Sequence, residues 1–280
     1  MAGLLADKTS KRSDVGVLPN PIECTTDVEA FFGTALAALR RRDVPFMVGG
    51  AYAMREYAGI VRDTKDLDVF CSPKDTRRIL NVLDALGCRT EMTHPTWLAK
   101  AVSGGAVLDV IFSSGNDRCR VDEIWHGHAR EATMLGVPVK VIPPEEMIWS
   151  KAYVQDRFRF DGADVAHLIL RQGSSLDWRR LLDRMGPDWE VLFAHLITFH
   201  FVYPDERAAV PAWVMRELGG RLQGQPAEHA APAPVCRGRM LTPHDYEIDV
   251  TEWGYQDASD PQIGHGDSTE AHGSAHRRSG

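Results

Sequence analysis

The sequence predicts an α/β fold of the α+β kind, in which a mixed β-sheet with flanking helices is followed by a helical lobe. Up to about residue 142, short apolar runs with strand character alternate with amphipathic helical segments. From Pro143 onward, helical periods follow one another. Beyond Gly219 the chain is rich in Gly, Pro, Ala, His and Asp, a composition too poor in apolar side chains to form a core of its own.

These changes in composition predict four segments. Residues 1–21 form a flexible N-terminal segment, residues 22–142 form the sheet domain and residues 143–220 form the helical lobe. Residues 221–280 form a largely disordered tail. Within that tail, residues 241–255 hold its aromatic side chains, and we expect them to dock on the helical lobe as an extended arm.

The first elements of the sheet domain prepare a binding site. An amphipathic helix begins at Thr26 and ends in arginines, where positive charge suits the helix dipole. The apolar run 46–48 predicts a buried strand, and Gly49 and Gly50 end it, so that a ligand can approach the backbone without a Cβ in the way. A short helix over 51–57 follows. Its free N–H groups would face an anion above the glycines, although a Gly-Gly pair is also an ordinary turn.

Two aspartates stand one residue apart on the next predicted strand, which covers residues 64–70. Successive side chains of a strand alternate between its faces, so Asp66 and Asp68 share one face. Adjacent carboxylates favour a divalent cation with oxygen ligands, and Mg²⁺ is the natural candidate. An exposed sheet edge with two acids is the alternative interpretation.

Asp109 is a lone acid in the apolar strand predicted over 106–112. Gly104-Gly105 predicts a hairpin with residues 97–103, which would lay Asp109 in the same sheet as the other two aspartates. A charge in such a run pairs with another charge or binds a metal, and a salt bridge to an arginine is the alternative. The three acids together predict a site for two Mg²⁺ ions, with Mn²⁺ as a substitute.

Further elements complete the predicted fold. A helix starts near Ser72, which can cap its first N–H groups with Asp75 as a capping-box acid, and it stops at Gly87. A hairpin over 133–141 adds to the edge of the sheet. The helices of the lobe are predicted over 143–157, 164–171, 178–185, 189–201 and 207–218.

The glycine pair, the Asp-x-Asp strand and the later lone acid resemble the DNA polymerase β-like nucleotidyltransferase superfamily, over roughly residues 44–170. The stretch from Arg62 to Asp68 is similar to the R-x-T-K-D-L-D of small bacterial members. The resemblance implies a nucleotidyltransferase-type sheet and metal-dependent transfer of a nucleoside monophosphate from an NTP to an acceptor hydroxyl, with release of pyrophosphate. Ala51 stands where the family often has serine, so a hydroxyl contact to phosphate is absent.

The resemblance also implies roles for individual residues. It makes three acids catalytic and metal-binding: Asp66, Asp68 and Asp109. It assigns six residues to the nucleotide: Gly49, Gly50, Arg62, Thr64, Lys65 and Lys151. Asp161 and Asp164 are implied as supports, and an ordinary exposed lysine is the alternative interpretation of Lys151.

Composition and charge bear on the partners and the cellular location of the protein. The formal net charge of −7 argues against a surface that coats nucleic acid, although arginines 40–42, or Arg157 with Arg159, could line a local basic groove. The five scattered cysteines without C-x-x-C spacing predict a cytoplasmic protein. No apolar stretch reaches the length of a membrane span, so we expect no membrane partner.

The acceptor stays open between a small molecule, tRNA and a protein. An acidic pocket would suit an aminoglycoside-like acceptor, whereas tRNA would need a basic track. Some small relatives of this fold are toxins, so an antitoxin is a candidate partner. The alternative from another class is a non-catalytic nucleotide-binding or toxin–antitoxin interaction module on the same fold.

Overall fold

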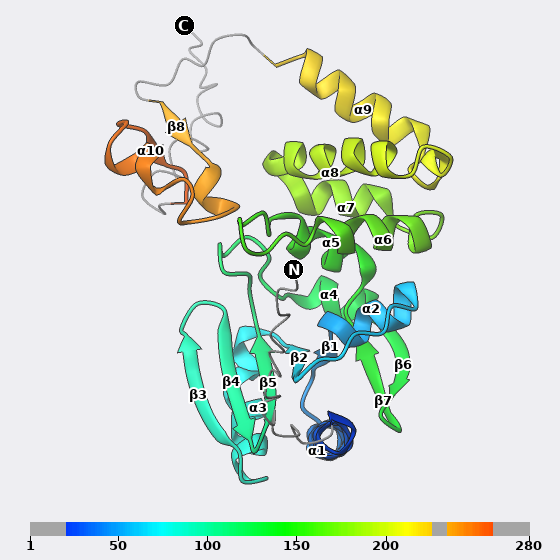
Figure 1. Cartoon of the computed structure of the whole chain (residues 1–280), viewed down its shortest axis with the longest axis vertical. Helices are drawn as coiled ribbons and strands as arrows, with labels where there is room; N and C mark the ends of the chain where they lie inside the picture. Colours follow the sequence, from blue (N-terminus) through cyan, green and yellow to red (C-terminus); the bar gives the residue numbers. More distant parts are fainter. Residues whose placement is uncertain (1–20, 226–233, 260–280) are drawn as a thin grey trace, which may run out of the picture.

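The computed structural model describes residues 21–225 and 234–259. Residues 1–20 of the predicted N-terminal segment, and residues 226–233 and 260–280 of the predicted disordered tail, lie outside the described residues. Figure 1 shows a sheet-containing lobe, a lobe of stacked helices above it, and the segment that carries β8 and α10 beside the helical lobe. Within the described ranges, no helix combines the length and the apolar composition that a bilayer crossing needs.

A seven-stranded mixed sheet forms the first lobe, with the strand order β3-β4-β5-β2-β1-β7-β6. The pairs β2·β5 and β1·β7 are parallel, and the other pairs are antiparallel. The mixed sheet confirms the predicted fold class. The strands are β1 (Met47–Val48), β2 (Asp66–Phe70), β3 (Arg89–His94), β4 (Leu98–Ser103), β5 (Ala106–Ile111), β6 (Arg130–Met134) and β7 (Val137–Val141).

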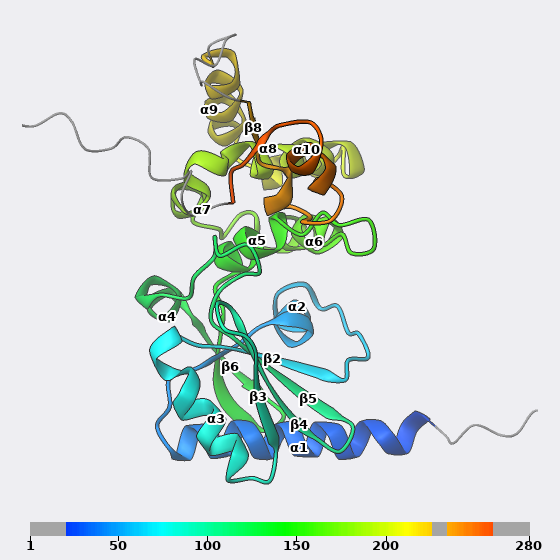
Figure 2. The same cartoon turned by 90° about the vertical axis from the view of Figure 1, so that its left-hand side faces the viewer.

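Helices pack around this sheet and above it. Helices α1 and α3 contact each other and strands of the sheet, whereas α2 contacts both β2 and the helical lobe through α6. Figure 2 shows α1 running across the end of the sheet lobe that is remote from the helical lobe. The helices of the sheet lobe are α1 (Pro21–Arg41), α2 (Gly50–Ala58), α3 (Thr76–Asp84) and α4 (Glu123–His128).

The helical lobe follows β7 directly. Its helices are α5 (Pro144–Ala152), α6 (Gly162–Gln172), α7 (Trp178–Met185), α8 (Trp189–Val202) and α9 (Ala212–Gln223). Single 3-10 turns occupy Pro73–Asp75, Gly186–Asp188, Arg207–Ala209 and Gly238–Met240. The C-terminal segment adds β8 (Val235–Cys236), α10 (Glu247–Thr251) and β9 (Gln256–Asp257).

One continuous apolar core joins the two lobes. Trp125 of α4 is fully buried and stacks on Phe70 of β2, with ring centroids 5.6 Å apart. Its other neighbour is Trp149 of α5, at 6.2 Å. Because these rings link the sheet to the first helix of the next lobe, the position of α5 over the sheet is fixed by apolar packing.

Several predicted elements differ from the observed ones. The sequence did not indicate β3 or α4, and the last helix of the helical lobe, α9, lies over Ala212–Gln223 instead of 207–218. The helix predicted to reach residue 157 ends at Ala152, because the Asp156 carboxylate accepts the Phe158 N–H (2.7 Å) and closes a turn that competes with helix. The Ser72 side chain makes no capping bond, and the Asp75 carboxylate pairs with Arg78 (2.7 Å) instead.

The C-terminal segment differs from the expected extended arm. It folds into short turns, and its attachment runs through Met240 and Thr242, which are both buried. Asn116 Nδ2 donates to the Met240 carbonyl (2.8 Å), and Thr242 Oγ1 donates to Asp156 Oδ2 (3.1 Å). The segment therefore contacts the loops that follow β5 and α5, while its aromatic side chains are exposed: Tyr246, Trp253 and Tyr255.

Candidate functional site

Three charged side chains stand in a row across three adjacent strands. The parallel register of β2 and β5 sets Asp68 opposite Asp109, and the antiparallel register of β4 and β5 sets Lys100 opposite Asp109. Asp109 thus lies in the same sheet as Asp66 and Asp68, as the hairpin prediction required. The opposite face at these positions is apolar and fully buried, with Leu67 and Leu108 at neighbouring register positions.

The charge of Asp109 opposes the ionisation of Asp68. Burial, and after it the charge of Asp109, raise the pKa of Asp68 to about 6, while Lys151 and Arg159 act in the opposite direction. Asp66 lies at the start of β2 and is exposed. Its backbone N–H donates to Thr64 Oγ1 (3.2 Å), so Thr64 shapes the turn into the strand.

Lys100 pairs with the third acid. Its Nζ lies 2.8 Å from Asp109 Oδ1, and the two side chains are 36% and 18% exposed. The partner of Asp109 is therefore a lysine of the neighbouring strand and not the arginine of the alternative interpretation. The sequence contains the signal for this pair, because equal steps outward from the Gly104-Gly105 turn lead to Lys100 on one strand and Asp109 on the other.

The two glycines allow the start of α2 to lie against the Asp68 carboxylate. Gly49 N–H donates to the Asp68 carbonyl (2.9 Å). Gly50 has φ +57°, and a Cβ built on it would lie 1.6 Å from Asp68 Oδ2. A Cβ on Gly49 would lie 2.3 Å from the Phe70 ring. No other residue type fits at either position without displacing a neighbour.

The basic side chains near the acids are themselves held by acids of the helical lobe. Lys151 Nζ lies 2.8 Å from both Asp161 Oδ2 and Asp164 Oδ2, and its side chain is only 15% exposed. Arg62 donates to Asp164 from both terminal guanidinium nitrogens, with Nη1 lying 3.1 Å from Oδ2. Arg159 lies 3.3 Å from Asp161. Lys151 is thus a mostly buried member of a network, and not the exposed lysine of the alternative interpretation.

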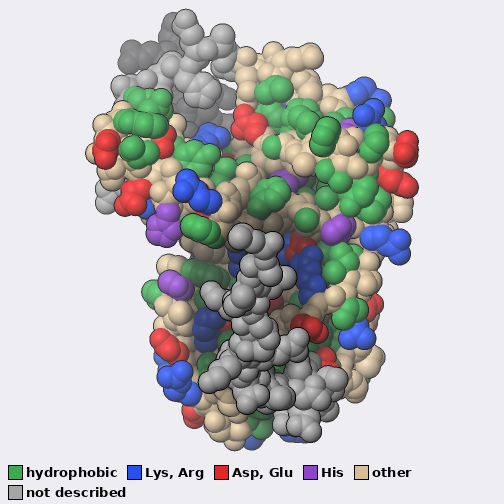
Figure 3. Space-filling view, in the orientation of Figure 1, with side chains coloured by type: hydrophobic (Ala, Val, Ile, Leu, Met, Phe, Trp, Pro, Cys, Tyr) green, Lys and Arg blue, Asp and Glu red, His purple; other side chains and the backbone are tan. Residues whose placement is uncertain are grey.

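The charges of this network keep its acids ionised. Burial would raise the pKa of Asp161, but Lys151 and Arg159 lower it below its usual value. Burial acts in the same direction on Asp164, and there Arg62 and Lys151 lower the pKa. Figure 3 shows basic and acidic side chains together at the waist between the lobes. Of the three cations in this network, Lys151 and Arg159 lie close enough to Asp68 to lower its pKa.

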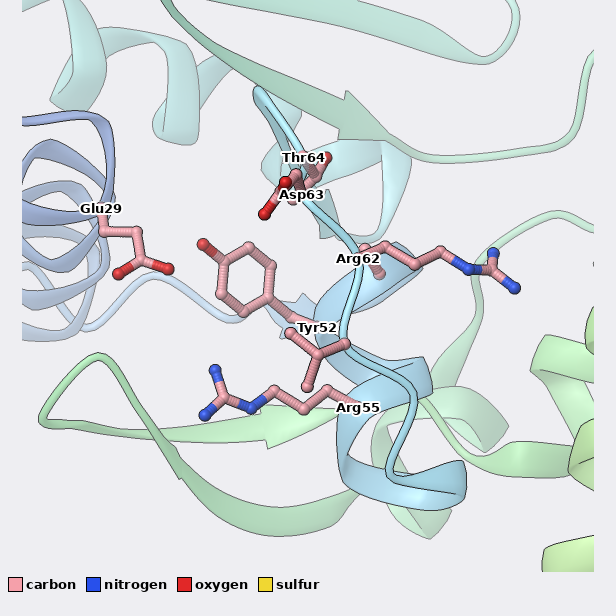
Figure 4. A pocket seen from close by; sticks show the side chains of 8 residues that line it. Glu29, Tyr52, Arg55, Arg62, Asp63 and Thr64 are labelled. Atoms are coloured by element: carbon pink, nitrogen blue, oxygen red, sulfur yellow. The ribbon is translucent and has the colours of Figure 1, made fainter. Parts of the chain in front are cut away.

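The remaining predicted nucleotide contacts lie at the approach to β2. Lys65 is exposed, and its carbonyl accepts the Val107 N–H (3.2 Å). Thr64 and Arg62 border a shallow pocket beside α2. Figure 4 shows Glu29, Tyr52 and Arg55 directed toward that pocket, while the Arg62 side chain extends away from it. Arg62 therefore borders the pocket, but its side chain extends away from it and is joined to Lys151 through Asp164.

Among the described residues, no three or more His, Cys, Asp or Glu side chains are arranged to hold a metal ion as they stand.

A wider crevice lies where the C-terminal segment meets the sheet lobe. Its lining includes Trp97 of the β3–β4 turn, Ser150 of α5 and His244 of the C-terminal segment. Trp97 stacks on His94, with ring centroids 5.3 Å apart.

Comparison with solved structures finds several chains similar to this one. The antibiotic-resistance factor ANT(2'')-Ia is similar at 20% identity over 63% of this chain and 98% of its own, with a TM-score of 0.45. An antigenic nucleotidyltransferase-like protein from Paracoccidioides brasiliensis is similar at 15% identity over 66% and 92%, with a TM-score of 0.43. The lincosamide antibiotic adenylyltransferase LnuA is similar at 16% identity over 50% and 94%, with a TM-score of 0.37. No curated protein sequence matches the chain.

A protein-family model matches the chain over residues 32–187, and its description is "Uncharacterised nucleotidyltransferase". The matched region contains the glycine pair, the three aspartates of the sheet, and the network around Lys151. It covers more than half of the chain and ends within the helical lobe. The chain therefore belongs to this nucleotidyltransferase family.

Proposed function

We propose that this protein transfers a nucleoside monophosphate from an NTP to an acceptor hydroxyl, with release of pyrophosphate, at the site around Asp68. The observation that carries the proposal is the register of β2 and β5, which sets Asp68 opposite Asp109 beside a glycine turn that admits no Cβ. A carboxylate pair beside a helix N-terminus suits a ligand that brings both cations and phosphate groups.

The donor set fits hard divalent cations. Carboxylate oxygens are the ligands that Mg²⁺ and Mn²⁺ prefer. Burial, and after it the charge of Asp109, raise the pKa of Asp68, and a bound cation would offset this cost of ionisation. Asp66, Asp68 and Asp109 would hold two Mg²⁺ ions, or Mn²⁺, which when bound lower the pKa of the attacking hydroxyl and neutralise the triphosphate.

The residues of the chain then orient the reactants. Gly49 and Gly50 let the start of α2 lie against the Asp68 carboxylate, so its first N–H groups would face phosphate oxygens bound beside that acid. Arg62, Lys151 and Arg159 would neutralise charge that develops on the phosphates. The acceptor oxygen forms the new bond to the α-phosphorus. The bond from that phosphorus to the bridging oxygen breaks, and pyrophosphate leaves with the electron pair. We assign the proton of the acceptor hydroxyl to the Asp109 carboxylate.

The crevice lined by Trp97, Ser150 and His244 is the proposed entry for the acceptor. Its lining includes Ser150, the residue before Lys151 on α5, and Trp97, whose carbonyl accepts the N–H of Phe112 (3.0 Å) directly after β5. The class of acceptor is left to experiment among a small molecule, tRNA and a protein.

Mass spectrometry tests the transfer directly. The protein would be incubated with a small-molecule extract, with tRNA or with a protein extract, each in the presence of Mg²⁺ and one labelled NTP. A component that gains the mass of a nucleoside monophosphate identifies the acceptor. Asp68→Asn should abolish the gain, whereas Asp183→Asn, which changes an exposed acid of α7, should leave it intact. Equal labelling by wild type and Asp68→Asn would refute the assignment of the site.

Calorimetry separates an enzyme from a non-catalytic nucleotide-binding or antitoxin-binding module. If the acids and the triphosphate share the cations, Mg²⁺ should tighten triphosphate binding, and triphosphate should raise the affinity for Mg²⁺ by the same factor. Asp109→Ala should reduce both effects together. Triphosphate binding that is indifferent to Mg²⁺ would favour the non-catalytic module.

A further inference from the structure

We propose that Lys100 is an internal counterion of the metal site: it pairs with Asp109 when no divalent cation is bound, and cation binding displaces it. The inference rests on the proposed function, because it concerns the same acids. It makes Lys100 a positioning residue that sets the affinity of the site for metal.

Lys100 occupies one of the carboxylate oxygens, Asp109 Oδ1, that a bound cation would use as a ligand. Its Nζ lies 2.8 Å from Asp109 Oδ1, which is a hydrogen-bonding distance. Asp109 in turn stands opposite Asp68 in the parallel register. A cation bound between these two carboxylates would therefore lie beside the ammonium group.

Electrostatics makes the two cations competitors. An ammonium group and a divalent ion on one carboxylate repel each other, and the repulsion is stronger in a partly buried site than in water. The Lys100 side chain is 36% exposed, so its flexible four-carbon stem can carry the ammonium group into solvent when a metal binds. The metal must then compete with an ion pair that is already formed.

Without metal, Lys100 is the cation that pairs with Asp109. The basic groups that act on Asp68 are Lys151 and Arg159, and both are paired with Asp161 of the helical lobe. Removal of the Lys100 charge should therefore leave Asp109 without its partner next to Asp68. The metal-free fold should lose stability, and the gain in stability on metal binding should increase.

The test compares the affinity for metal alone in matched variants. Lys100→Met removes the charge and keeps the apolar stem, Lys100→Gln removes the charge with a polar group, and Lys100→Arg keeps the charge. Lys140→Met is the control, because Lys140 also faces an acid across a hairpin, Glu131, in the strand pair β6·β7. Mg²⁺ binding would be measured by calorimetry and Mn²⁺ binding by electron paramagnetic resonance, with no nucleotide present. Melting curves would confirm that each variant is folded.

Both neutral variants should bind Mg²⁺ and Mn²⁺ about three- to tenfold more tightly than wild type, since one repulsive charge is removed. The metal affinities of Lys100→Arg and Lys140→Met should stay within roughly twofold of wild type, since a change at one exposed charge has an effect of about this size. An unchanged or weaker affinity in Lys100→Met and Lys100→Gln would overturn the proposal for Lys100, while a loss of binding in Asp68→Asn would still uphold the metal site. Metal binding that is insensitive to Asp68→Asn would overturn both.

Discussion

At the scale of single residues, Gly50 connects the backbone conformation to the site. Its φ of +57° lies in the left-handed region, and the Asp68 carboxylate occupies the space of the missing Cβ. Gly104 has the same φ of +57° at the tip of the β4–β5 hairpin, but a Cβ there would meet nothing within 4 Å. A substitution at Gly104 would therefore add backbone strain alone, whereas a substitution at Gly50 would add both strain and a steric clash with Asp68.

Gly104→Ala should destabilise the fold by about 1 kcal/mol, through backbone strain alone. Gly50→Ala should cost about 2–5 kcal/mol, because strain and overpacking add, and it should also lose metal affinity because Asp68 must move. Denaturant unfolding with and without Mg²⁺ measures both effects. Equal losses of stability in the two variants would show that the Asp68 carboxylate is not held against Gly50.

Asp68 should make the stability of the metal-free protein depend on pH. Its pKa is raised from 3.8 to about 6 in the fold, first by burial and then by Asp109. The folded state therefore binds a proton that the unfolded chain has released between these values, so stability falls as pH rises from about 4 to 6. The cost at neutral pH is about 1–3 kcal/mol for a shift of this size.

Asp68→Asn should remove that cost. In the presence of a chelator, the free energy of unfolding of the variant should equal that of wild type near pH 4. Above pH 6 it should be larger by about 1–3 kcal/mol. Thermal melts across this pH range, with Asp183→Asn as a control for the loss of an exposed acid, would measure the difference. Parallel curves for wild type and Asp68→Asn would contradict the raised pKa.

At the scale of elements, buried ion pairs fix α5, which carries Lys151. Glu146 of α5 is fully buried, and its Oε1 lies 3.5 Å from Arg180 and 3.2 Å from Arg184 of α7. Glu145 Oε1 accepts the backbone N–H of Asp177 (2.7 Å) at the start of α7. These bonds hold α5 against α7. The packing of these helices therefore fixes the backbone that carries Lys151, so its ammonium group stays close to Asp161 and Asp164.

Asp164 at the start of α6 joins the two lobes through charge, because it binds Arg62 from the sheet lobe and Lys151 from α5. Asp164→Asn should cost about 1–3 kcal/mol of stability, less than a fully buried pair because Arg62 is half-exposed. It should also weaken triphosphate binding. Glu217→Gln breaks the exposed Arg221–Glu217 pair of α9 and should change stability by less than about 0.5 kcal/mol. Similar effects in both variants would mean that Asp164 is only a surface partner.

At the scale of the whole molecule, the C-terminal segment packs on two loops that border the site. Met240 and Thr242 are almost fully buried there, so a chain that ends after Gln225 should melt roughly 2–8 °C lower. Deletion of Ser259–Gly280 removes almost no apolar side chains and should change neither the melting temperature nor triphosphate binding. An unchanged melting temperature after the longer truncation would show that the segment contributes no packing energy.

The sequence by itself determined the elements that local periodicity and turn residues specify. Alternation along residues 64–70 placed Asp66 and Asp68 on one face, and Gly104-Gly105 fixed the hairpin that carries Asp109. The helix of residues 178–185 was predicted with its observed bounds. Such features depend on neighbours in the chain, so their physical causes are visible in a short window of sequence.

Only the tertiary structure decided which distant groups meet. The parallel pairing of β2 with β5 sets Asp68 beside Asp109, and packing of α6 over α2 brings Asp164 to Arg62, a separation of 102 residues. Met240 is buried at a loop that follows β5, whereas the more aromatic stretch after it remains exposed. Pairings of this kind arise because distant elements bury a shared apolar core and neutralise each other's charges. The hydrophobic periodicity of a single segment contains no information about either.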